Sequence, residues 1–356
     1  MKLQLIKELL LSLSILGMSC TALASDNDDG EYYNMLLDED EFSSVDIDYN
    51  SYIHRDPNLH FQGNSTIKDV LEYPLFKDFA RFLVPCLDKD ALGVTLDNLK
   101  KLMPYHRNIS IENTLEVLDH LESDIKAGKQ VFYPIYDELQ QKENPELKDT
   151  GFFFIRGKLR APYAVVVSGG YDYRSVLHEG FPLALRLSHC GYNVFVLVYR
   201  QKSAQKGSLD LMNALNQIDW HARQFGVQKE NYSMWGASSG AQVIIAVTHG
   251  AENAIRQGKL TTRSVANIFE YPISFYASYA DAPTYVVVGQ NDKIINSTVL
   301  KSSVANLQKL ELDAKYIELP RLSHGFGLGE KREKEDWVQD AINFWKQNMV
   351  EKNLDL

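Results

Sequence analysis

The chain has 356 residues, of which 45% are hydrophobic, and it carries a formal net charge of -10 at pH 7. A chain of this length and apolar content can bury a full core without a structural metal or a disulfide framework. Its acidic balance and lack of a basic cluster argue against nucleic acid or an anionic membrane as a partner, because either would be bound by a basic patch.

The beginning of the chain has the pattern of a secretory signal peptide. Two lysines precede an apolar stretch at 9–18, and the Ala-Leu-Ala sequence at 22–24 supplies the small residues that a signal peptidase accepts. We therefore expect residues 1–24 to be removed by cleavage near Ala24, which predicts a secreted or periplasmic protein. No later stretch reaches the roughly 18 apolar residues that a membrane span requires, so we expect no span in the mature chain.

The cysteines leave one alternative open. Cys20 could be the lipidated first residue of a lipoprotein, but Gly17 stands three positions before it, where such a signal has a leucine. If the leader is removed, Cys86 and Cys190 remain. They could form one disulfide, but so few cysteines do not build a scaffold, and we expect two buried thiols.

The region before the predicted sheet divides into an acidic leader and a helical segment. Ten Asp and Glu residues lie between 26 and 48, so we expect 25–64 to be a disordered leader. An apolar pattern at 66–84, broken once by a proline, and a second pattern that ends at Gly128 predict helices over 65–128. This segment either packs against the main domain or binds substrate or a partner, and packing is the interpretation we favour.

From residue 129 onward strands and helices alternate, and we assign 129–352 to one large domain. The stretches 131–136 and 151–156 predict a hairpin at a sheet edge. Nearly continuous apolar runs then mark buried strands at 163–167 and 193–199, and further strands are predicted at 232–235, 265–269, 284–288 and 314–319. Helical patterns separate these strands, at 179–189, 209–225, 241–249, 297–310 and 334–349. Such alternation predicts an α/β fold with a mostly parallel, doubly wound sheet and helices on both faces.

A nucleophile is predicted where one of these strands turns directly into a helix. Residues 236–240 read Gly-Ala-Ser-Ser-Gly, a G-x-S-x-G sequence. The small residues let strand and helix approach closely, and Ser238 is forced into a strained backbone conformation that exposes its hydroxyl. The helix N-terminus also favours the negative charge that develops in acyl transfer. We predict that Ser238 is a nucleophile, the alternative being an ordinary Gly-Ser loop.

A serine nucleophile requires a base, and the base requires an acid that orients it. His324 lies in a glycine-rich loop after the last predicted strand, where its side chain can overhang the strand ends. Asp292 follows a very apolar strand, and the chain order Ser, Asp, His matches a known hydrolase topology. Glu270 and Asp281 are rival acids. Most of the other histidines, except His178, are expected to be surface or packing residues: His54, His60, His106, His120, His189, His221 and His249.

The oxyanion hole is expected from two backbone amides. One belongs to Ser239, directly after the nucleophile, and the other to Gly170 or Tyr171 in the loop after the first buried strand. A plain turn is the alternative interpretation of that loop. We expect Tyr171, Tyr173 and His178 to contact substrate at the mouth of the site. His178 and the glutamate after it could equally serve in helix capping or local pairing.

Four short sequences carry a family resemblance: Ser-Gly-Gly at 168–170, G-x-S-x-G at 236–240, Gly-x-x-Asp at 289–292 and Ser-His-Gly-Phe at 323–326. In this order they resemble α/β-hydrolases of the bacterial acetyl esterase and acetylxylan esterase type, over residues 130–350. The resemblance implies an α/β-hydrolase fold with a sheet of about eight strands, a triad of Ser238, Asp292 and His324, and no cofactor or metal. The His-Gly-Gly-Gly sequence of the hormone-sensitive-lipase branch is missing, so the oxyanion donors and the acyl preference stay open.

Together these features predict a secreted serine esterase that hydrolyses short-acyl, above all acetyl, esters of small molecules or carbohydrates. No long insertion separates residues 269 and 284, where many lipases of this fold carry a lid, and this favours an open site. A peptidase of the prolyl-oligopeptidase type is the alternative among hydrolases, but about 100 N-terminal residues are too few for its propeller. An inactive hydrolase domain that serves as a binding protein is the alternative outside the enzymes.

Overall fold

The computed structural model describes residues 60–106, 109–258, 260–329 and 336–350. They belong to one unit of the chain, which spans 56–356, whereas the other unit, Met1–Arg55, lies outside the description. The predicted signal peptide and nearly all of the predicted leader therefore fall on residues that are not described. In the described ranges, no helix has both the length and the apolarity needed to span a bilayer.

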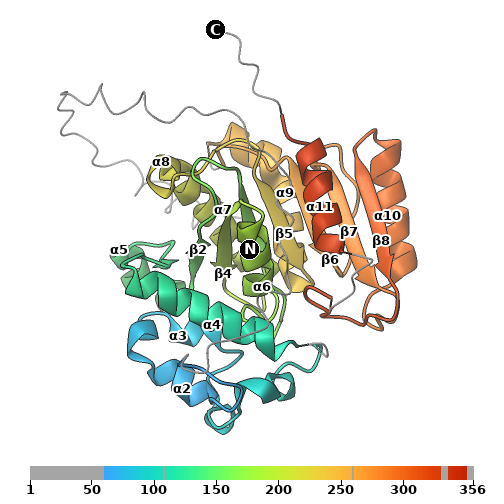
Figure 1. The fold of residues 1–356 in the computed structure, drawn as a ribbon. Helices are drawn as coiled ribbons and strands as arrows, with labels where there is room; N and C mark the ends of the chain where they lie inside the picture. Colours follow the sequence, from blue (N-terminus) through green and yellow to red (C-terminus); the bar gives the residue numbers. More distant parts are fainter. Residues whose placement is uncertain (1–59, 107–108, 259, 330–335, 351–356) are drawn as a thin grey trace, which may run out of the picture. The chain divides into compact units, whose positions relative to one another are not determined.

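An eight-stranded sheet forms the centre of the described chain, with the strand order β1-β2-β4-β3-β5-β6-β7-β8 (Figure 1). The strands are β1 (Phe132–Tyr133), β2 (Gly151–Ile155), β3 (Tyr163–Val167), β4 (Asn193–Val198), β5 (Ser233–Ala237), β6 (Ala266–Glu270), β7 (Thr284–Gly289) and β8 (Ala314–Leu319). β2 pairs antiparallel with β1 and with β4, and all other neighbours are parallel. The predicted mostly parallel sheet is confirmed.

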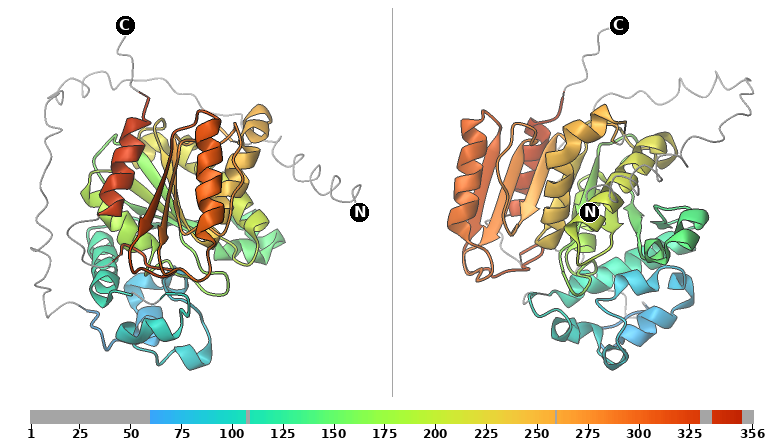
Figure 2. Two further views of the ribbon diagram at one scale, coloured as in Figure 1. Left: turned by 90° about the vertical axis from the view of Figure 1, so that its right-hand side faces the viewer. Right: turned by 180° about the vertical axis from the view of Figure 1, so that it is seen from behind.

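Helices cover both faces of this sheet. They are α6 (Gly180–His189), α7 (Ala204–Trp220), α8 (Ala222–Phe225), α9 (Ser239–Arg256), α10 (Ser297–Lys309) and α11 (Trp337–Gln347). α6 and α11 lie on one face and α7, α9 and α10 on the other (Figure 1 and Figure 2). Because both faces are covered, the strands from β2 to β6 are buried at every residue, as the nearly continuous apolar sequences of β3 and β4 predicted for those two strands.

Two predicted elements differ in detail from the structure. The helix predicted over 209–225 begins earlier, at Ala204, because the Ser203 side chain accepts from the Lys206 N–H and caps it there. It also divides into α7 and α8. The predicted edge hairpin pairs as expected, but β1 has only two residues, and its connection to β2 contains α5 (Glu138–Glu143).

The predicted N-terminal segment is built from short helices (blue to teal in Figure 1). They include α2 (Ile67–Glu72), α3 (Ala80–Leu83) and the longer α4 (Ile111–Lys126). Aromatic rings pack the segment against the sheet edge. The ring centroids of Phe79 and Phe153 of β2 are 5.2 Å apart, and those of Phe82 and Phe132 of β1 are 5.0 Å apart. Its apolar side chains thereby belong to the same core as the sheet. Both described cysteines are free, half-buried thiols.

Candidate active site

Ser238 lies at the turn from β5 into α9, at the carboxyl ends of the parallel strands. Its φ is 49°, a left-handed conformation that costs a residue with a Cβ about 1–3 kcal/mol. A Cβ on Gly240 would lie 2.0 Å from the carbonyl oxygen of Val167, and one on Gly236 would lie 2.8 Å from Cα of Ala241. Both positions therefore require glycine, as the close approach of strand and helix predicted.

Three predicted residues form one chain of contacts. The Nε2 atom of His324 lies 3.0 Å from Oγ of Ser238, and its Nδ1 atom lies 2.8 Å from Oδ2 of Asp292. They follow β5, β7 and β8, whose carboxyl ends meet at one edge of the sheet. When Nδ1–H donates to the carboxylate, Nε2 carries the lone pair and can accept the hydroxyl proton of Ser238. This geometry is the one that the predicted nucleophile, base and orienting acid require.

The carboxylate of Asp292 is fixed from both sides. The N–H groups of Ile294 and Ile295 donate to Oδ1 at 2.8 and 3.0 Å, which leaves Oδ2 for His324. Burial alone raises the pKa of Asp292, but the hydrogen bond and charge of His324 and these two amides outweigh it, and the pKa is lowered. The acid therefore stays charged at neutral pH and keeps the imidazole in one orientation.

The two rival acids have other surroundings. Oδ1 of Asp281 lies 3.4 Å from Nε2 of His249, a residue of α9. Glu270 ends β6 and is only 3% exposed, and burial together with the nearby charge of Glu179 raises the pKa of its carboxyl well above the ordinary value. A neutral carboxyl cannot stabilise a protonated histidine as an anion does. Of the three acids, Asp292 is the one that the described structure places on the base.

The loop after β3 passes directly beside the serine. A Cβ on Gly169 would lie 3.1 Å from Cβ of Ser238. The N–H of Gly169 donates to the buried carboxylate of Glu179 at 2.8 Å, so the amides that remain for an oxyanion are those of Gly170 and Tyr171. Gly170 has a φ of 90°, and a Cβ there would lie 2.2 Å from a backbone carbonyl oxygen, so this position requires glycine.

The start of α9 forms the other side of the same space. Ser239 is the first residue of the helix, and the first N–H groups of a helix have no partner within it. The hydroxyl of Tyr199 lies 3.0 Å from the carbonyl oxygen of Ser168 and 3.3 Å from Oγ of Ser239. Gln201 donates to the carbonyl oxygen of Gly170 at 2.9 Å. Sequence reasoning missed Tyr199 and Gln201, although their place just after β4 puts them at this edge.

The three residues predicted to contact substrate differ in exposure. Tyr171 is 56% exposed. Tyr173 is buried, and its hydroxyl lies 2.8 Å from Nδ1 of His106. His178 is buried too and donates from Nε2 to the carbonyl oxygen of Gly325 at 3.2 Å, while burial lowers the pKa of His178 to about 4. Tyr171 thus offers a ring to a ligand, whereas Tyr173 and His178 contact the protein, which is the local-pairing alternative for His178.

A buried carboxylate, that of Glu179, lies behind these loops, and its contacts agree with the local-pairing alternative for this residue. Oε1 of Glu179 accepts from Nε2 of His106 and from the Tyr271 hydroxyl, both at 2.6 Å. Oε2 accepts from the N–H of Gly169 at 2.8 Å and from Oγ of Ser175 at 2.6 Å. Burial raises the pKa of Glu179, but the charge and hydrogen bond of His106 lead the effects that lower it well below its ordinary value. Glu179 is therefore an anion inside the protein.

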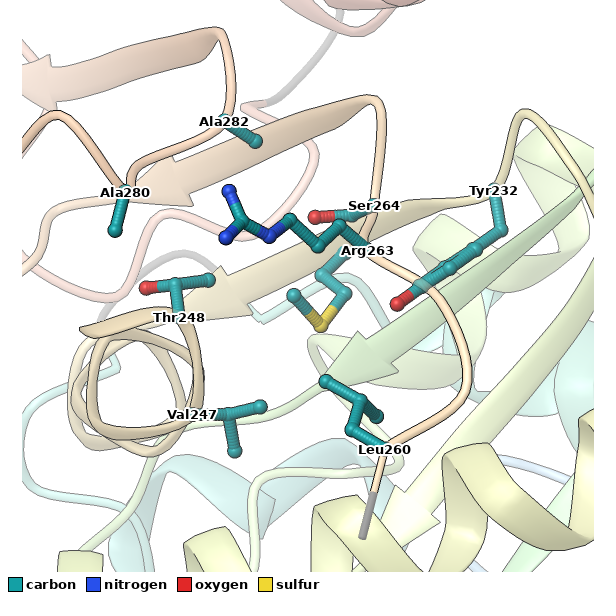
Figure 3. Close-up of a pocket in the computed structure, with 9 residues that line it drawn as sticks. Tyr232, Val247, Thr248, Leu260, Arg263, Ser264, Ala280 and Ala282 are labelled. Carbon is teal, nitrogen blue, oxygen red and sulfur yellow. The ribbon is translucent and has the colours of Figure 1, made fainter. Parts of the chain in front are cut away.

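A pocket elsewhere in the domain is separate from this site. It is lined by residues that include Tyr232, Leu260 and Ser264, at the amino ends of β5 and β6 (Figure 3). The predicted catalytic residues lie at the opposite, carboxyl ends of the strands. Within the described residues, no three His, Cys, Asp or Glu side chains are grouped so that they could hold a metal ion.

Comparisons with known proteins rest on the fold. No family model and no curated protein matches the sequence. The structure is similar to an acetyl ester-xyloside bifunctional hydrolase from Caldicellulosiruptor lactoaceticus, with a TM-score of 0.52 and 16% identity, over 61% of this chain and 95% of the other. It is also similar to MGS-M1, an α/β hydrolase from a Medee basin deep-sea metagenome library, with a TM-score of 0.49 and 18% identity, over 56% and 92% of the two chains. The likeness to the hydrolase from Caldicellulosiruptor lactoaceticus, together with the order of the eight strands, shows the α/β-hydrolase fold that the sequence resemblance implied.

Proposed function

We propose that the chain is a secreted serine esterase that hydrolyses short-acyl esters, with acetylated carbohydrates as its natural class of substrate. The observation that carries the proposal is the contact chain from Ser238 Oγ through His324 to Asp292, at 3.0 and 2.8 Å. A half-buried serine on a strained turn, next to a histidine that a buried carboxylate orients, is an arrangement suited to acyl transfer.

In the acylation step, the Oγ atom of Ser238 attacks the ester carbonyl while Nε2 of His324 accepts its proton. The resulting imidazolium is stabilised by Asp292, whose low pKa keeps it charged. The imidazolium then protonates the departing alcohol, and an acyl-enzyme on Ser238 remains. In the second half, a water molecule loses a proton to His324 and attacks the acyl carbon. The bond from the acyl carbon to Oγ of Ser238 then breaks, His324 returns the proton to Oγ, and the acid is released.

The negative oxygen of the tetrahedral intermediate is bound by backbone amides. Ser239 supplies one of them at the start of α9, and Gly170 or Tyr171 supplies the other. Amides held rigidly around the developing charge need no reorganisation during the reaction, and each contributes roughly 10²- to 10³-fold to kcat. The N–H of Gly169 already donates to Glu179, so this N–H orients the loop and does not bind the substrate oxygen.

Two features at the entrance of the site support this substrate class. The connection from β6 to β7 spans 271–283 and contains no helix that could form a lid. Tyr171 presents an exposed ring there, as a surface for a sugar or another small alcohol group. The similar protein from Caldicellulosiruptor lactoaceticus is described as an acetyl ester-xyloside hydrolase, which makes acetylated xylosides the first glycans to test.

The test is a series of p-nitrophenyl esters from acetyl to decanoyl, followed by acetylated xylosides and a peptide panel. We expect acetyl and butyryl esters to be hydrolysed with the highest kcat/KM, since a long acyl chain gains about 0.8 kcal/mol per methylene only where an apolar tunnel buries it. A preference that rises up to decanoyl would favour a lipase. Cleavage of peptides alone would favour the peptidase alternative, and no turnover with no fluorophosphonate labelling would favour an inactive binding protein.

The secreted location is a separate part of the proposal. It rests on the lysines, the apolar stretch at 9–18 and the Ala-Leu-Ala sequence at 22–24. Expression of the full chain in a bacterial host, with N-terminal sequencing of the protein outside the cytoplasm, is expected to find Ser25 as the first residue. Retention of residues 1–24 in a cytoplasmic product would contradict it.

A further inference from the structure

The segment before the sheet places one polar side chain inside the catalytic domain. The side chains of His106 and Glu179 are each 2% exposed, and Nε2 of His106 lies 2.6 Å from Oε1 of Glu179. Nδ1 of the same ring lies 2.8 Å from the hydroxyl of Tyr173, so both ring nitrogens are engaged. A buried anion is costly unless donors surround it, and Glu179 has four.

The other donors to Glu179 lead directly to the active site. The N–H of Gly169 donates to Glu179 at 2.8 Å, and Gly169 lies beside Ser238 in the loop after β3, which we call the oxyanion loop. The hydroxyl of Tyr271 donates to Glu179 at 2.6 Å. The ring of Tyr271 also packs against the imidazole of His324, with 4.8 Å between the ring centroids. One carboxylate therefore fixes the oxyanion loop on one side and the surroundings of the base on the other.

The same segment also contacts the loop that carries the base. A Cβ on Gly325, the residue after His324, would lie 2.7 Å from the carbonyl oxygen of Tyr105 and 2.8 Å from the ring of His106. Gly325 has a φ of 66°, so both the available space and the backbone conformation require glycine. The backbone of the histidine loop is thus packed directly on residues of the N-terminal segment.

From these contacts we infer that His106 is a positioning residue of the esterase: through Glu179 it holds the oxyanion loop and the histidine loop in their reactive arrangement. The N-terminal segment is then part of the catalytic apparatus and does more than cover the sheet edge. This inference rests on the proposed function, because the loops that it concerns are those assigned to the oxyanion hole and the base.

The test compares variants at His106 and Tyr271 with a matched control in the same segment. His106→Leu removes the donor to Glu179, His106→Gln restores an N–H donor, and Tyr271→Phe keeps the ring on His324 while it removes the hydroxyl. The control is Tyr73→Phe, since the Tyr73 hydroxyl also donates to a buried carboxylate, that of Glu122, at 2.7 Å.

We expect His106→Leu and Tyr271→Phe to lower kcat for p-nitrophenyl acetate about 10- to 100-fold with KM within about twofold, as for other residues that orient catalytic groups. His106→Gln should recover most of kcat, and Tyr73→Phe should keep the wild-type value at a similar melting temperature. Tyr271→Phe gives the answer if His106→Leu does not fold. Wild-type kcat in folded His106→Leu and Tyr271→Phe, or an equal loss in Tyr73→Phe, would overturn the positioning role.

Hydrogen exchange provides a readout that does not require esterase activity. In His106→Leu, peptides that cover 168–175 and 322–328 should exchange faster than in the wild type, whereas Tyr73→Phe should leave both unchanged. Faster exchange in a chain that hydrolyses no ester would reject the esterase and keep the positioning contact. Unchanged exchange together with unchanged kcat would reject the positioning role and keep the esterase.

Discussion

The backbone N–H of Ser238 donates to the carbonyl oxygen of Glu270 at 2.9 Å. This hydrogen bond continues the pairing of β5 with β6 one residue beyond the strand, so it fixes the serine on the neighbouring strand while its φ is 49°. The strained conformation of Ser238 is therefore maintained by the hydrogen bond to β6 on one side and by the start of α9 on the other. The strained conformation directs the hydroxyl toward Nε2 of His324, and its cost in stability can be measured.

The first prediction separates that strain from catalysis. Ser238→Ala and Ser238→Gly both remove the nucleophile, so each should lower kcat about a thousandfold or more and abolish fluorophosphonate labelling. Only the glycine relieves the left-handed conformation, and we expect it to be more stable than the alanine variant by about 1 kcal/mol. Denaturant unfolding of both variants measures the difference. Retained esterase activity in either variant would exclude Ser238 as the nucleophile.

A second prediction ranks the acids. Asp292→Asn leaves the histidine without its charged partner and should lower kcat by orders of magnitude with little change in KM. Glu270→Gln should stay active, because the raised pKa of Glu270 already makes that carboxyl neutral, and Asp281→Asn should stay active, because Asp281 pairs with His249. Steady-state kinetics of the three variants decides the matter; the reverse ranking would move the acid to β6.

A third prediction concerns the oxyanion loop. In Gly170→Ala the new Cβ would lie 2.2 Å from the carbonyl oxygen of Tyr173, and the φ of 90° is strained for alanine. The loop must shift, and we expect kcat to fall roughly 10²-fold or more with a smaller change in KM. Gly250→Ala in α9 is the control, since a Cβ there meets nothing within 4 Å. Equal activity of the two variants would place the oxyanion donors elsewhere.

The fourth prediction uses two neighbouring glutamates with opposite pKa shifts. Glu179 has a lowered pKa in the folded protein, so its contribution to stability is present above the unfolded pKa of about 4.3 and is lost as the pH falls below it. Glu270 has a raised pKa, so the folded protein binds a proton that the unfolded chain releases, and stability is lost as the pH rises above about 4.3.

Melting temperatures measured from pH 3.5 to 7 should therefore change in opposite directions for the two variants. Relative to the wild type, Glu179→Gln should be least destabilised at the acid end, and its deficit should grow toward neutral pH. Glu270→Gln should improve relative to the wild type as the pH rises, because it no longer has to bind a proton on folding. Parallel curves for the two variants would contradict the assignment of charge to these carboxyls.

The sequence alone determined the architecture of the domain and the identity of the candidate triad. Continuous apolar strands alternating with helices specify a parallel sheet, because only strands covered on both faces read in this way. A G-x-S-x-G turn and two polar residues after later strands must then meet at the carboxyl edge. In the structure His324 lies 3.0 Å from Oγ of Ser238 and 2.8 Å from Oδ2 of Asp292, and the catalytic role of the three residues stays a prediction.

Only the tertiary structure decided what surrounds these residues. His106 and Tyr271 lie 73 and 92 positions from Glu179 in the chain. No local sequence pattern predicts that both side chains donate to its buried carboxylate. Tyr173 and His178 were expected at the mouth and are buried instead. The physical reason is that local sequence patterns report periodic burial, whereas polar groups inside a protein are satisfied by whichever donors the packed chain brings to them, at any separation.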